Sequence, residues 1–279
     1  MAMPAGVHLS TTRITPMQAI QRFPKEEKRK IRYVLTDIDD TLTVDGRLPA
    51  VAFSAMEALH HAGIRVVPIT GRPAGWCDHI ARMWPVDGLV GENGAFYFCY
   101  DAPGKKMIRR YWKPEAERAA DHLRLEAIRK RVLAEVPGCA VAADQPYREA
   151  DLAIDFCEDV DPLPLSAAVA IKAIFEAAGA TAKISSIHVN GWFGDYDKLS
   201  MTRLLFAEIF KVDLDAVRDQ VVFCGDSPND APMFAHFSHA VGVANIRAFD
   251  GRLDASPAWI TRGEGGIGFA EMVAVLLDR

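Results

Sequence analysis

The sequence predicts an α/β protein with a Rossmann-like core, in which helices cover both faces of a parallel sheet, and with an inserted α+β cap domain. Two observations support this fold class. Short β-branched runs alternate with segments of helical periodicity up to about residue 91 and again from about residue 194. Between these parts, the pattern changes to a hairpin followed by helix, strand, helix and strand. We therefore expect an N-terminal tail at 1–27, a core made of 28–91 and 194–279, and a cap at 92–193.

The first part of the core has the order strand, helix, strand, helix, strand, which favours right-handed crossovers and a parallel sheet. The first helix has apolar residues at i, i+3, i+4 and i+7 and a glycine after its end, at Ala52, Ala55, Met56, Leu59 and Gly63. Pro73 suits the first turn of the second helix. The elements are expected at 31–35, 49–62, 64–69, 73–84 and 88–90.

The expected cap begins with a hairpin, because two apolar strands at 95–100 and 107–112 flank the turn residues Asp101–Gly104. Its other elements are expected at 114–135, 150–157, 164–178 and 183–189. The core then resumes with a helix at 195–210, strands at 220–224, 239–243 and 258–261, and a closing helix at 267–277.

Composition excludes several classes of protein. Half of the 279 residues are hydrophobic and the net charge is -5, so the chain has no basic footprint for nucleic acid. No apolar run is long enough to cross a bilayer, so we expect no membrane partner. The five cysteines are widely spaced and form no metal-binding or disulfide pattern. We expect reduced thiols in a cytoplasmic protein that is a monomer or a homodimer.

Two carboxylates follow the first strand, at the strand end where open α/β sheets bind ligands. Because side chains alternate along an extended chain, Asp37 and Asp39 project to the same side, roughly 6 to 7 Å apart. One can attack a phosphate as a nucleophile while the other acts as acid or base. An isolated pair of this kind is more typical of a polar loop whose acids cap a turn or a helix start.

The charge of this strand end predicts a metal ion. Two anions about 4 Å apart repel by about 4 kcal/mol at an effective dielectric constant of about 20, and a phosphate ester adds further negative charge. A divalent cation removes this repulsion. Oxygen ligands beside a phosphate favour Mg²⁺.

Three other strand ends or helix starts carry similar groups. Thr70 follows the second strand, and its hydroxyl with the amides of Gly71 and Arg72 can hold phosphate oxygens. Lys198 lies in the first turn of an expected helix, where the helix dipole does not favour a cation. Asp226 and Asp230 follow another strand and, four residues apart, face the same direction. Since the carboxyl ends of parallel strands share one edge, these groups are expected to converge on one pocket.

With this set, the sequence resembles the haloacid dehalogenase (HAD) superfamily of aspartate-nucleophile phosphotransferases. Asp37, Asp39 and Thr41 match its D-x-D-x-T motif, Thr70 and Lys198 its second and third motifs, and Gly225, Asp226 and Asp230 its fourth. The length of the cap and the Gly-Glu-Asn-Gly-Ala stretch at 91–95 are similar to the Cof-type (IIB) members with a large α/β cap. Asp40 and Leu199 stand where glycines are frequent, which leaves every catalytic group in place.

The resemblance implies a Mg²⁺-dependent phosphatase acting on a small phosphorylated metabolite, with a sugar phosphate as the expected substrate. Asp37 would form an aspartyl-phosphate, and Asp39 would protonate the leaving oxygen and then activate water. The implied metal ligands are Asp37, Asp226, the carbonyl of Asp39 and, close by, Asp230. The phosphate- or substrate-binding residues are expected to be Thr41, Thr70, Gly71, Arg72, Asn93, Lys198 and Asn229.

Other interpretations stay open at this point. A phosphosugar mutase, similar to phosphomannomutases, would use the same aspartyl-phosphate but return the phosphoryl group to a sugar. A phospho-accepting or binding protein without catalysis is a third possibility, although such a protein has no use for Asp39 as an acid or base.

The roles of four further residues stay open. Arg72 and Glu92 are each expected to contact either the substrate or the hinge of the cap. His188 and Asn190 are either substrate contacts or a solvated strand end.

Overall fold

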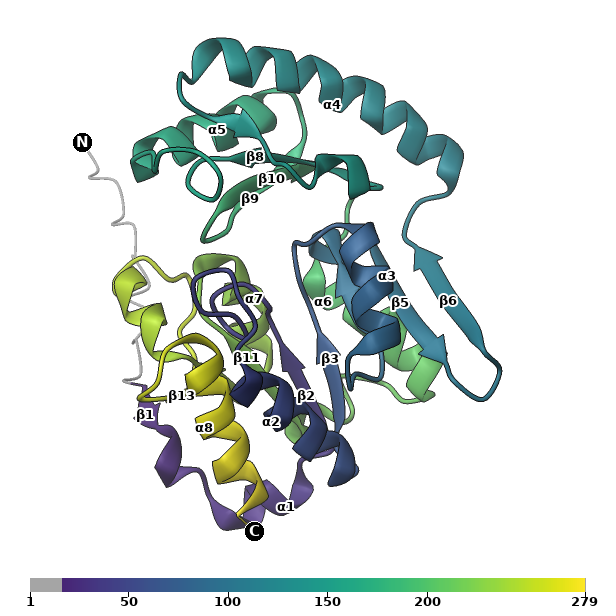
Figure 1. Cartoon of the computed structure of the whole chain (residues 1–279), viewed down its shortest axis with the longest axis vertical. Helices are drawn as coiled ribbons and strands as arrows, with labels where there is room; N and C mark the ends of the chain where they lie inside the picture. The colour runs from purple at the N-terminus through teal and green to yellow at the C-terminus, as the bar shows by residue number, and fades with distance from the viewer. Residues whose placement is uncertain (1–16, 279) are drawn as a thin grey trace, which may run out of the picture.

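The structure is a computed structural model that describes residues 17–278, with a core below and a cap above it in Figure 1. The core is built on a six-stranded sheet with the order β1-β13-β12-β11-β2-β3. Neighbouring strands in this sheet run parallel, as the sequence predicts. The strands are β1 (Gln18–Ala19), β2 (Tyr33–Thr36), β3 (Arg65–Pro68), β11 (Val221–Gly225), β12 (His239–Gly242) and β13 (Trp259–Ile260).

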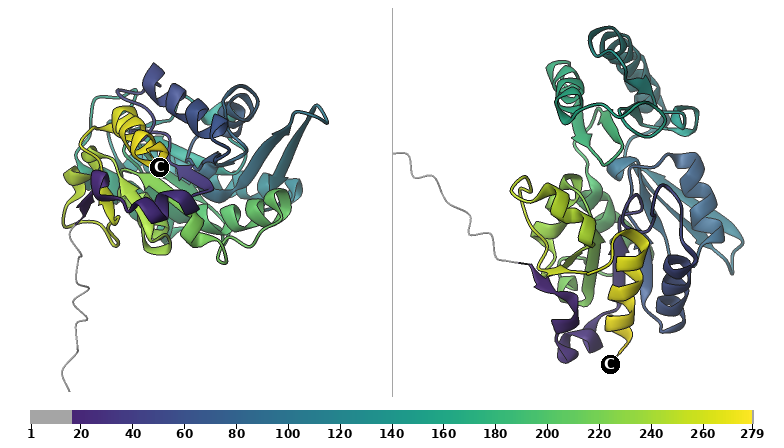
Figure 2. Two further views of the ribbon diagram at one scale, coloured as in Figure 1. Left: turned by 90° about the horizontal axis from the view of Figure 1, so that it is seen from below. Right: turned by 60° about the vertical axis from the view of Figure 1, so that its left-hand side comes forward.

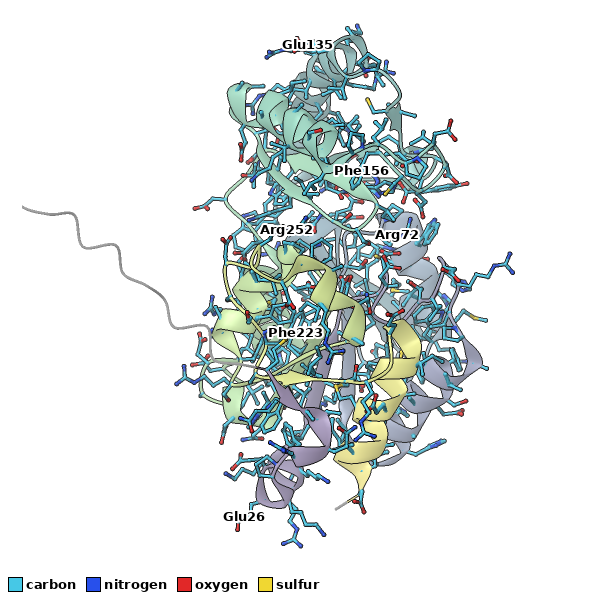
Figure 3. The ribbon with its side chains drawn as sticks, turned by 90° about the vertical axis from the view of Figure 1, so that its left-hand side faces the viewer. Glu26, Arg72, Glu135, Phe156, Phe223 and Arg252 are labelled. Carbon is cyan, nitrogen blue, oxygen red and sulfur yellow. The ribbon has the colours of Figure 1, made fainter. Side chains whose placement is uncertain are left out.

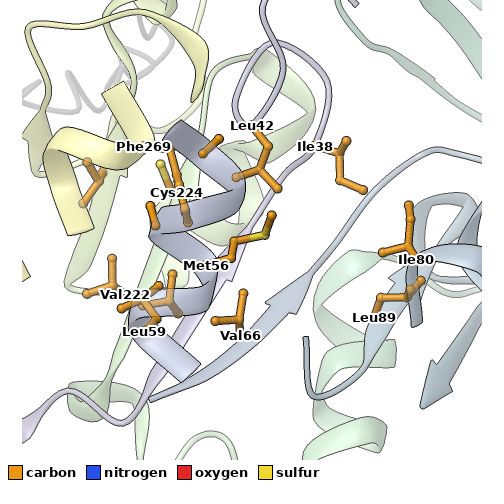
Figure 4. Close-up of a cluster of buried hydrophobic side chains, with 14 of the residues drawn as sticks. Ile38, Leu42, Met56, Leu59, Val66, Ile80, Leu89, Val222, Cys224 and Phe269 are labelled. Atoms are coloured by element: carbon orange, nitrogen blue, oxygen red, sulfur yellow. The ribbon is translucent and has the colours of Figure 1, made fainter. Parts of the chain in front are cut away.

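Helices cover both faces of this sheet. Side chains alternate along β2, so Val34 packs into the cluster of α2 (Ala50–His61) and α8 (Gly265–Leu277), while Leu35 packs toward α6 (Lys198–Leu205) and α7 (Ala231–His236). Figure 4 shows part of the first cluster, and Met56 of α2 and Phe269 of α8 are among its labelled side chains. The predicted inward positions of α2 are confirmed, because Ala52, Ala55, Met56 and Leu59 are buried.

The hairpin belongs to the core and not, as expected, to the cap. Ile69 after β3 forms a parallel bridge with Val90 in β4 (Leu89–Gly91), and β4 pairs antiparallel with β5 (Phe96–Asp101) and through it with β6 (Lys106–Tyr111). The hairpin packs against α3 (Ala74–Met83) and α6, and it projects from the side of the core in Figures 1 and 2. The physical reason is that the apolar residues Phe96 and Phe98 are buried in the core cluster.

The cap is a separate antiparallel sheet with the order β7-β8-β10-β9, covered by two helices on the side away from the core (Figure 1). Its elements are α4 (Glu115–Glu135), β7 (Ala140–Val141), β8 (Asp151–Asp155), α5 (Leu165–Ala177), β9 (Thr181–Ile184) and β10 (His188–Trp192). The single strand expected at 183–189 is wrong: a bend at 185–187 divides it into β9 and β10. This bend lies over the core.

Residues 1–16 of the expected tail lie outside the described residues. The rest of the tail, residues 17–27, packs on the core. Gln18 and Ala19 pair with β13, and Ile20 and Phe23 are buried in the core cluster. The charged run forms helix α1 (Lys25–Lys30). Short 3-10 or π turns complete the fold at Ile20–Arg22, Glu92–Gly94, Gln145–Tyr147, Phe206–Phe210, Arg218–Gln220, Pro228–Asp230 and Ala244–Phe249.

All five cysteines are free thiols, as predicted. Burial raises the pKa of Cys77 and of Cys224 well above the usual range, which makes these thiols poor nucleophiles. Within residues 17–278, none of the helices combines the length and the apolar character that a bilayer span requires.

Candidate active site

The predicted catalytic groups meet at the carboxyl ends of the central strands. Asp37 directly follows β2, and its backbone N–H donates to the Cys224 carbonyl of β11 at 2.9 Å. Asp226 directly follows β11. Because β2 and β11 are adjacent and parallel, two carboxylates from distant parts of the sequence reach the same edge of the sheet.

Lys198 joins two of these acids. Its Nζ donates to Asp37 Oδ1 and to Asp230 Oδ1, at 2.8 Å in each case. A capping box formed by Asp197 and Ser200 sets the start of α6 and so places Lys198 in the first helical turn. Burial opposes the charge on Lys198, but Asp230 and Asp37 outweigh it and raise the pKa of the ammonium. The lysine is therefore a fixed positive charge beside Asp37.

Asp37, Asp226 and Asp230 form a buried carboxylate cluster, with one oxygen from each lying within 4.8 Å of the others. Three carboxylates and one ammonium leave this cluster with a net charge of about −2 if all are ionised. Burial, and then the charges of neighbouring acids, raise the pKa of Asp226 well above its usual range. Burial likewise raises the pKa of Asp37, although Lys198 acts in the opposite direction.

These residues fit a divalent cation. The donors are all oxygen atoms, they are close enough to share one ion, and their excess charge matches a 2+ ion. Outer contacts fix Asp226 in place: the Thr41 hydroxyl donates to its Oδ1 at 2.9 Å, and the Asn245 amide reaches its Oδ2 at 3.5 Å. The carboxylate of Asp39 lies outside the cluster, so its predicted metal contact is limited to the backbone carbonyl.

Thr41 has a different partner from the one expected. It is completely buried, and its hydroxyl donates to Asp226 Oδ1. Sequence reasoning placed it with the phosphate-binding residues because it belongs to the same short motif. Its observed contact is with an acid of the carboxylate cluster.

The loop after β3 forms another wall of the site. The Thr70 hydroxyl accepts a hydrogen bond from the Arg72 backbone N–H at 3.0 Å, and Gly71 lines the cleft with Asp37 and Asp39. The side chain of Asn93 lies against Gly71, because a Cβ added to this glycine would be only 3.2 Å from Asn93 Nδ2. Asn93 adopts a left-handed conformation (φ 54°), and its N–H donates to the Thr70 carbonyl at 3.0 Å, so it supports this loop from behind.

Arg72 is the central cation of the cleft, at the level where cap and core meet in Figure 3. Its Nε donates to both carboxylate oxygens of Asp39, at 2.9 and 3.0 Å. Its other nitrogens contact two cap acids, Glu158 at 2.6 Å and Asp144 at 3.4 Å. Burial opposes its charge, but Asp39 and Glu158 raise the pKa of the guanidinium. The candidate acid–base residue is thus linked to the cap through one side chain.

The cap supplies three site residues that sequence reasoning did not find, Ser185, Ser186 and Ile187, and two that it left open, His188 and Asn190. The cleft is closed by the bend at 185–187 and by His188 and Asn190 on β10. Their side chains face the core because Val189 between them packs on the cap helices. His188 Nε2 lies 2.9 Å from Glu158, and Asn190 donates to Asp151 at 2.9 Å.

Glu92 connects the core with the cap. Its buried carboxylate accepts a hydrogen bond from the Ala74 N–H of the core at 3.0 Å. It also accepts hydrogen bonds from three consecutive cap amides, those of residues 149–151. Nearby, Arg148 of the cap donates to the Gly71 carbonyl at 2.9 Å. Cap and core are therefore joined by hydrogen bonds that are buried or partly buried beside the cleft.

Comparison with known proteins agrees with this architecture. Residues 34–126 match the family model of the haloacid dehalogenase-like hydrolases. Comparison with curated proteins by sequence gives no match. A crystal structure of a Thermoplasma acidophilum protein matches with a TM-score of 0.65 and 17% identity, over 88% of this chain and 98% of the other.

Two further solved structures share the fold. The C-terminal domain of trehalose-6-phosphate phosphatase from C. albicans matches with a TM-score of 0.69 and 12% identity, over 95% of this chain and 99% of that domain. Sucrose-phosphatase from Synechocystis sp. PCC6803, in complex with sucrose and phosphate, has a TM-score of 0.58 and 14% identity, over 88% of this chain and 97% of the other.

The fold is a parallel α/β core with an inserted antiparallel cap, and acidic side chains gather at the strand ends of the core. Over residues 34–126 the chain is similar to the haloacid dehalogenase-like hydrolases, and it shares its fold with the solved structures above.

Proposed function

We propose that this protein is a divalent-metal-dependent phosphatase that hydrolyses the phosphate monoester of a small metabolite through an aspartyl-phosphate. The observation that carries this proposal is the contact of Lys198 with both Asp37 and Asp230, in a cluster that includes Asp226. A nucleophilic carboxylate, a fixed cation and an oxygen-only ligand set in one place suit phosphoryl transfer.

The chain's own residues account for both steps. An Asp37 oxygen bonds to phosphorus, the bond from phosphorus to the ester oxygen breaks, and Asp39 gives its proton to that oxygen. Asp39 then takes a proton from water as the water oxygen bonds to phosphorus, which releases phosphate and regenerates Asp37. Arg72 holds Asp39 by two hydrogen bonds and so orients it toward the cleft.

Other groups stabilise the transferring phosphoryl group. Lys198, the Thr70 hydroxyl and the amide of Gly71 would bind its oxygens, and Asn229, which lines the cleft, would bind either the phosphate or the substrate. Asp37, Asp226 and Asp230, with the carbonyl of Asp39, would hold Mg²⁺. When bound, this ion would neutralise the acids and draw negative charge from the phosphate oxygens.

A sugar phosphate is the substrate class that we propose. The cleft wall contributed by the cap is polar, with Ser185, Ser186, His188 and Asn190, and such groups can bind hydroxyls. Two proteins of the same fold are a trehalose-6-phosphate phosphatase and a sucrose-phosphatase. We propose that the cap comprises residues 113–193, which follow the hairpin. It closes over the site as one inserted unit.

Phosphate release from a panel of sugar phosphates tests this function. With Mg²⁺ we expect free phosphate from at least one sugar phosphate, and we expect EDTA to abolish its release. The variant Asp37→Asn should lose activity by about 10³-fold or more while keeping its fold, because it removes the nucleophile. Asp45→Asn is the matched control, since Asp45 is exposed in a nearby turn.

Three results would contradict the proposal. Activity that is indifferent to EDTA would remove the metal from it. Substantial turnover by Asp37→Asn would mean that another residue is the nucleophile. A product that is an isomeric sugar phosphate, without free phosphate, would make the protein a mutase.

A further inference from the structure

The cap wall of the cleft has a marked excess of acids. Arg72 contacts three carboxylates, those of Asp39, Glu158 and Asp144. The neighbouring Arg148 contacts Asp144 again and Asp151, both at 2.9 Å, and its side chain is completely buried. Four carboxylates therefore share two guanidinium groups on this side of the site.

Neither guanidinium is available to a ligand without displacing a protein acid. Among the described residues that line the cleft, Arg72 is the only arginine or lysine, and each of its three nitrogens already contacts a carboxylate. Lys198 lies deeper, on the two acids of the phosphate-binding end. Within the part of the chain that the structure describes, the leaving-group end of the cleft therefore has no free positive charge.

Lys183 is a further cation on this face of the cap. It lies opposite Asn190 in the register of β9 with β10, so both side chains project to the core side. Neither Lys183 nor Glu158 is among the residues that line the cleft, but Glu158 contacts two that are, Arg72 and His188, whereas Lys183 is exposed. Solvent therefore screens it far more than Glu158, whose side chain is only 26% exposed.

On the basis of the proposed function, we propose that Glu158 is a specificity-determining residue that rejects a second anionic group on the substrate. The enzyme therefore takes monophosphates of uncharged polyols and sugars. A hydroxyl near Glu158 can donate a hydrogen bond to it. A carboxylate or a second phosphate must either approach Glu158 and Asp39 or replace Glu158 on Arg72, which leaves the displaced acid unpaired.

The environment of Glu158 keeps it ionised. Burial acts against the charge, but hydrogen bonds from His188 and Arg72 lower the pKa of Glu158 to about 2. The geometry agrees with this direction, because Glu158 Oε1 lies 2.6 Å from Arg72 and Oε2 lies 2.9 Å from His188. A negative charge is thus present at this wall throughout the neutral pH range.

A pair of linear ligands that differ at one end isolates this effect. Sorbitol 6-phosphate ends in a hydroxymethyl group, whereas 6-phosphogluconate has a carboxylate at the same position. The ratio of their Kd values is measured by calorimetry with Mg²⁺, in the Asp37→Asn variant so that nothing is turned over. We expect the neutral ligand to bind tighter by about 30-fold or more, and Glu158→Gln to reduce this ratio by about 10-fold.

Two further variants serve as controls. Asp159→Asn makes the same change of charge at an exposed neighbour that does not contact Arg72, and it should leave the ratio within about 2-fold. Lys183→Met should change the ratio by less than about 3-fold, because Lys183 is solvated. Thermal unfolding confirms that each variant is folded.

The proposal is overturned if both ligands bind equally well, if neither binds, if Glu158→Gln leaves the ratio unchanged, or if Lys183→Met changes it more than Glu158→Gln does. These outcomes are distinct from failure of the proposed function. The readout is binding, and phosphate release by the unmodified protein is measured separately with p-nitrophenyl phosphate.

Discussion

Glu92 of the core and Ala150 of the cap are joined by a hydrogen bond of 2.7 Å from the Ala150 N–H to the Glu92 carboxylate. The same carboxylate accepts the N–H groups of Ala74, Glu149 and Asp151. Burial, followed by the charge of Asp151, raises the pKa of Glu92 to about 8, while Arg148 and the backbone N–H groups act in the opposite direction. One side chain therefore satisfies amides on both sides of the hinge.

Removal of this side chain should destabilise the protein and loosen the cap. Glu92→Ala leaves several partly or fully buried N–H groups without an acceptor, and an unsatisfied buried donor costs about 1–3 kcal/mol. We expect the free energy of unfolding to fall by about 2–4 kcal/mol in urea titrations. Glu92→Gln keeps one acceptor oxygen and should have a smaller effect. Limited proteolysis should also cut Glu92→Ala faster at the junction of cap and core.

Glu149→Ala is the control for this experiment, because Glu149 is next to the hinge and pairs at 3.3 Å with Arg118, with side chains that are 45% and 11% exposed. A change of up to about 1 kcal/mol is expected for such a partly exposed pair. Equal stability losses in Glu149→Ala and Glu92→Ala would mean that Glu92 has no special role at the hinge.

Lys198→Met should separate the two roles of the lysine. Without metal, the variant leaves Asp37 and Asp230 with no buried counter-ion, and the loss of one partner from such a pair costs about 3–5 kcal/mol. Mg²⁺ can restore part of this stability, since it also neutralises the acids. It should not restore activity, which we expect to fall by about 10²–10³-fold because the phosphoryl group loses a cation.

Thermal unfolding with Mg²⁺ or EDTA, together with phosphate release, measures both effects. Lys130→Met is a suitable comparison, because Lys130 lies on α4 with 73% of its side chain exposed. If Lys198→Met retained normal turnover, the lysine would be a structural partner of the acids and nothing more.

Thr41→Val tests whether the threonine positions a metal ligand. The substitution keeps the shape but removes the hydroxyl that donates to Asp226 at 2.9 Å. Loss of a contact behind a metal ligand typically reduces metal affinity or activity by about 10–100-fold. We therefore expect the Mg²⁺ concentration for half-maximal activity to rise by about 10-fold or more, with the KM for substrate little changed. A rise in KM alone would instead indicate that Thr41 binds the substrate. Thr181→Val, at an exposed position of β9, is the control.

The parts of the fold and the site that follow from local pattern could be predicted from sequence. The apolar run before Asp37 fixes a buried strand, and the parallel order of β2 and β11 then brings Asp37 and Asp226 to one edge. The spacing of Ala52, Met56 and Leu59 identifies the buried face of α2 in the same way. These inferences need only the periodicity of helices and strands and the geometry of a parallel sheet.

The contacts that depend on how the cap docks could not be predicted. Arg72 and Glu158 are 86 positions apart, and nothing in either segment indicates the other. The bend at 185–187 carries only two serines as a turn signal, so β9 and β10 read as one strand. The sequence predicts the hairpin as part of the cap, because the hairpin follows the change of pattern after residue 91. Burial of Phe96 and Phe98 keeps it on the core.

The pairing of Glu158 with Arg72 and His188 should make the stability difference between the protein and Glu158→Gln depend on pH. The pKa of Glu158 is lowered from 4.5 to about 2 in the folded protein, so its ionised form stabilises the fold above pH 4.5, and this contribution is lost as the pH falls toward 2. Allowing for solvent screening, we expect a difference of about 1–3 kcal/mol at pH 6–7 that declines steadily toward pH 3. Urea titrations at several pH values measure it, with Asp159→Asn expected to differ by less than about 0.5 kcal/mol. If the free energies of unfolding of the unmodified protein and of Glu158→Gln changed with pH in the same way, the Arg72–Glu158 contact would contribute nothing to stability.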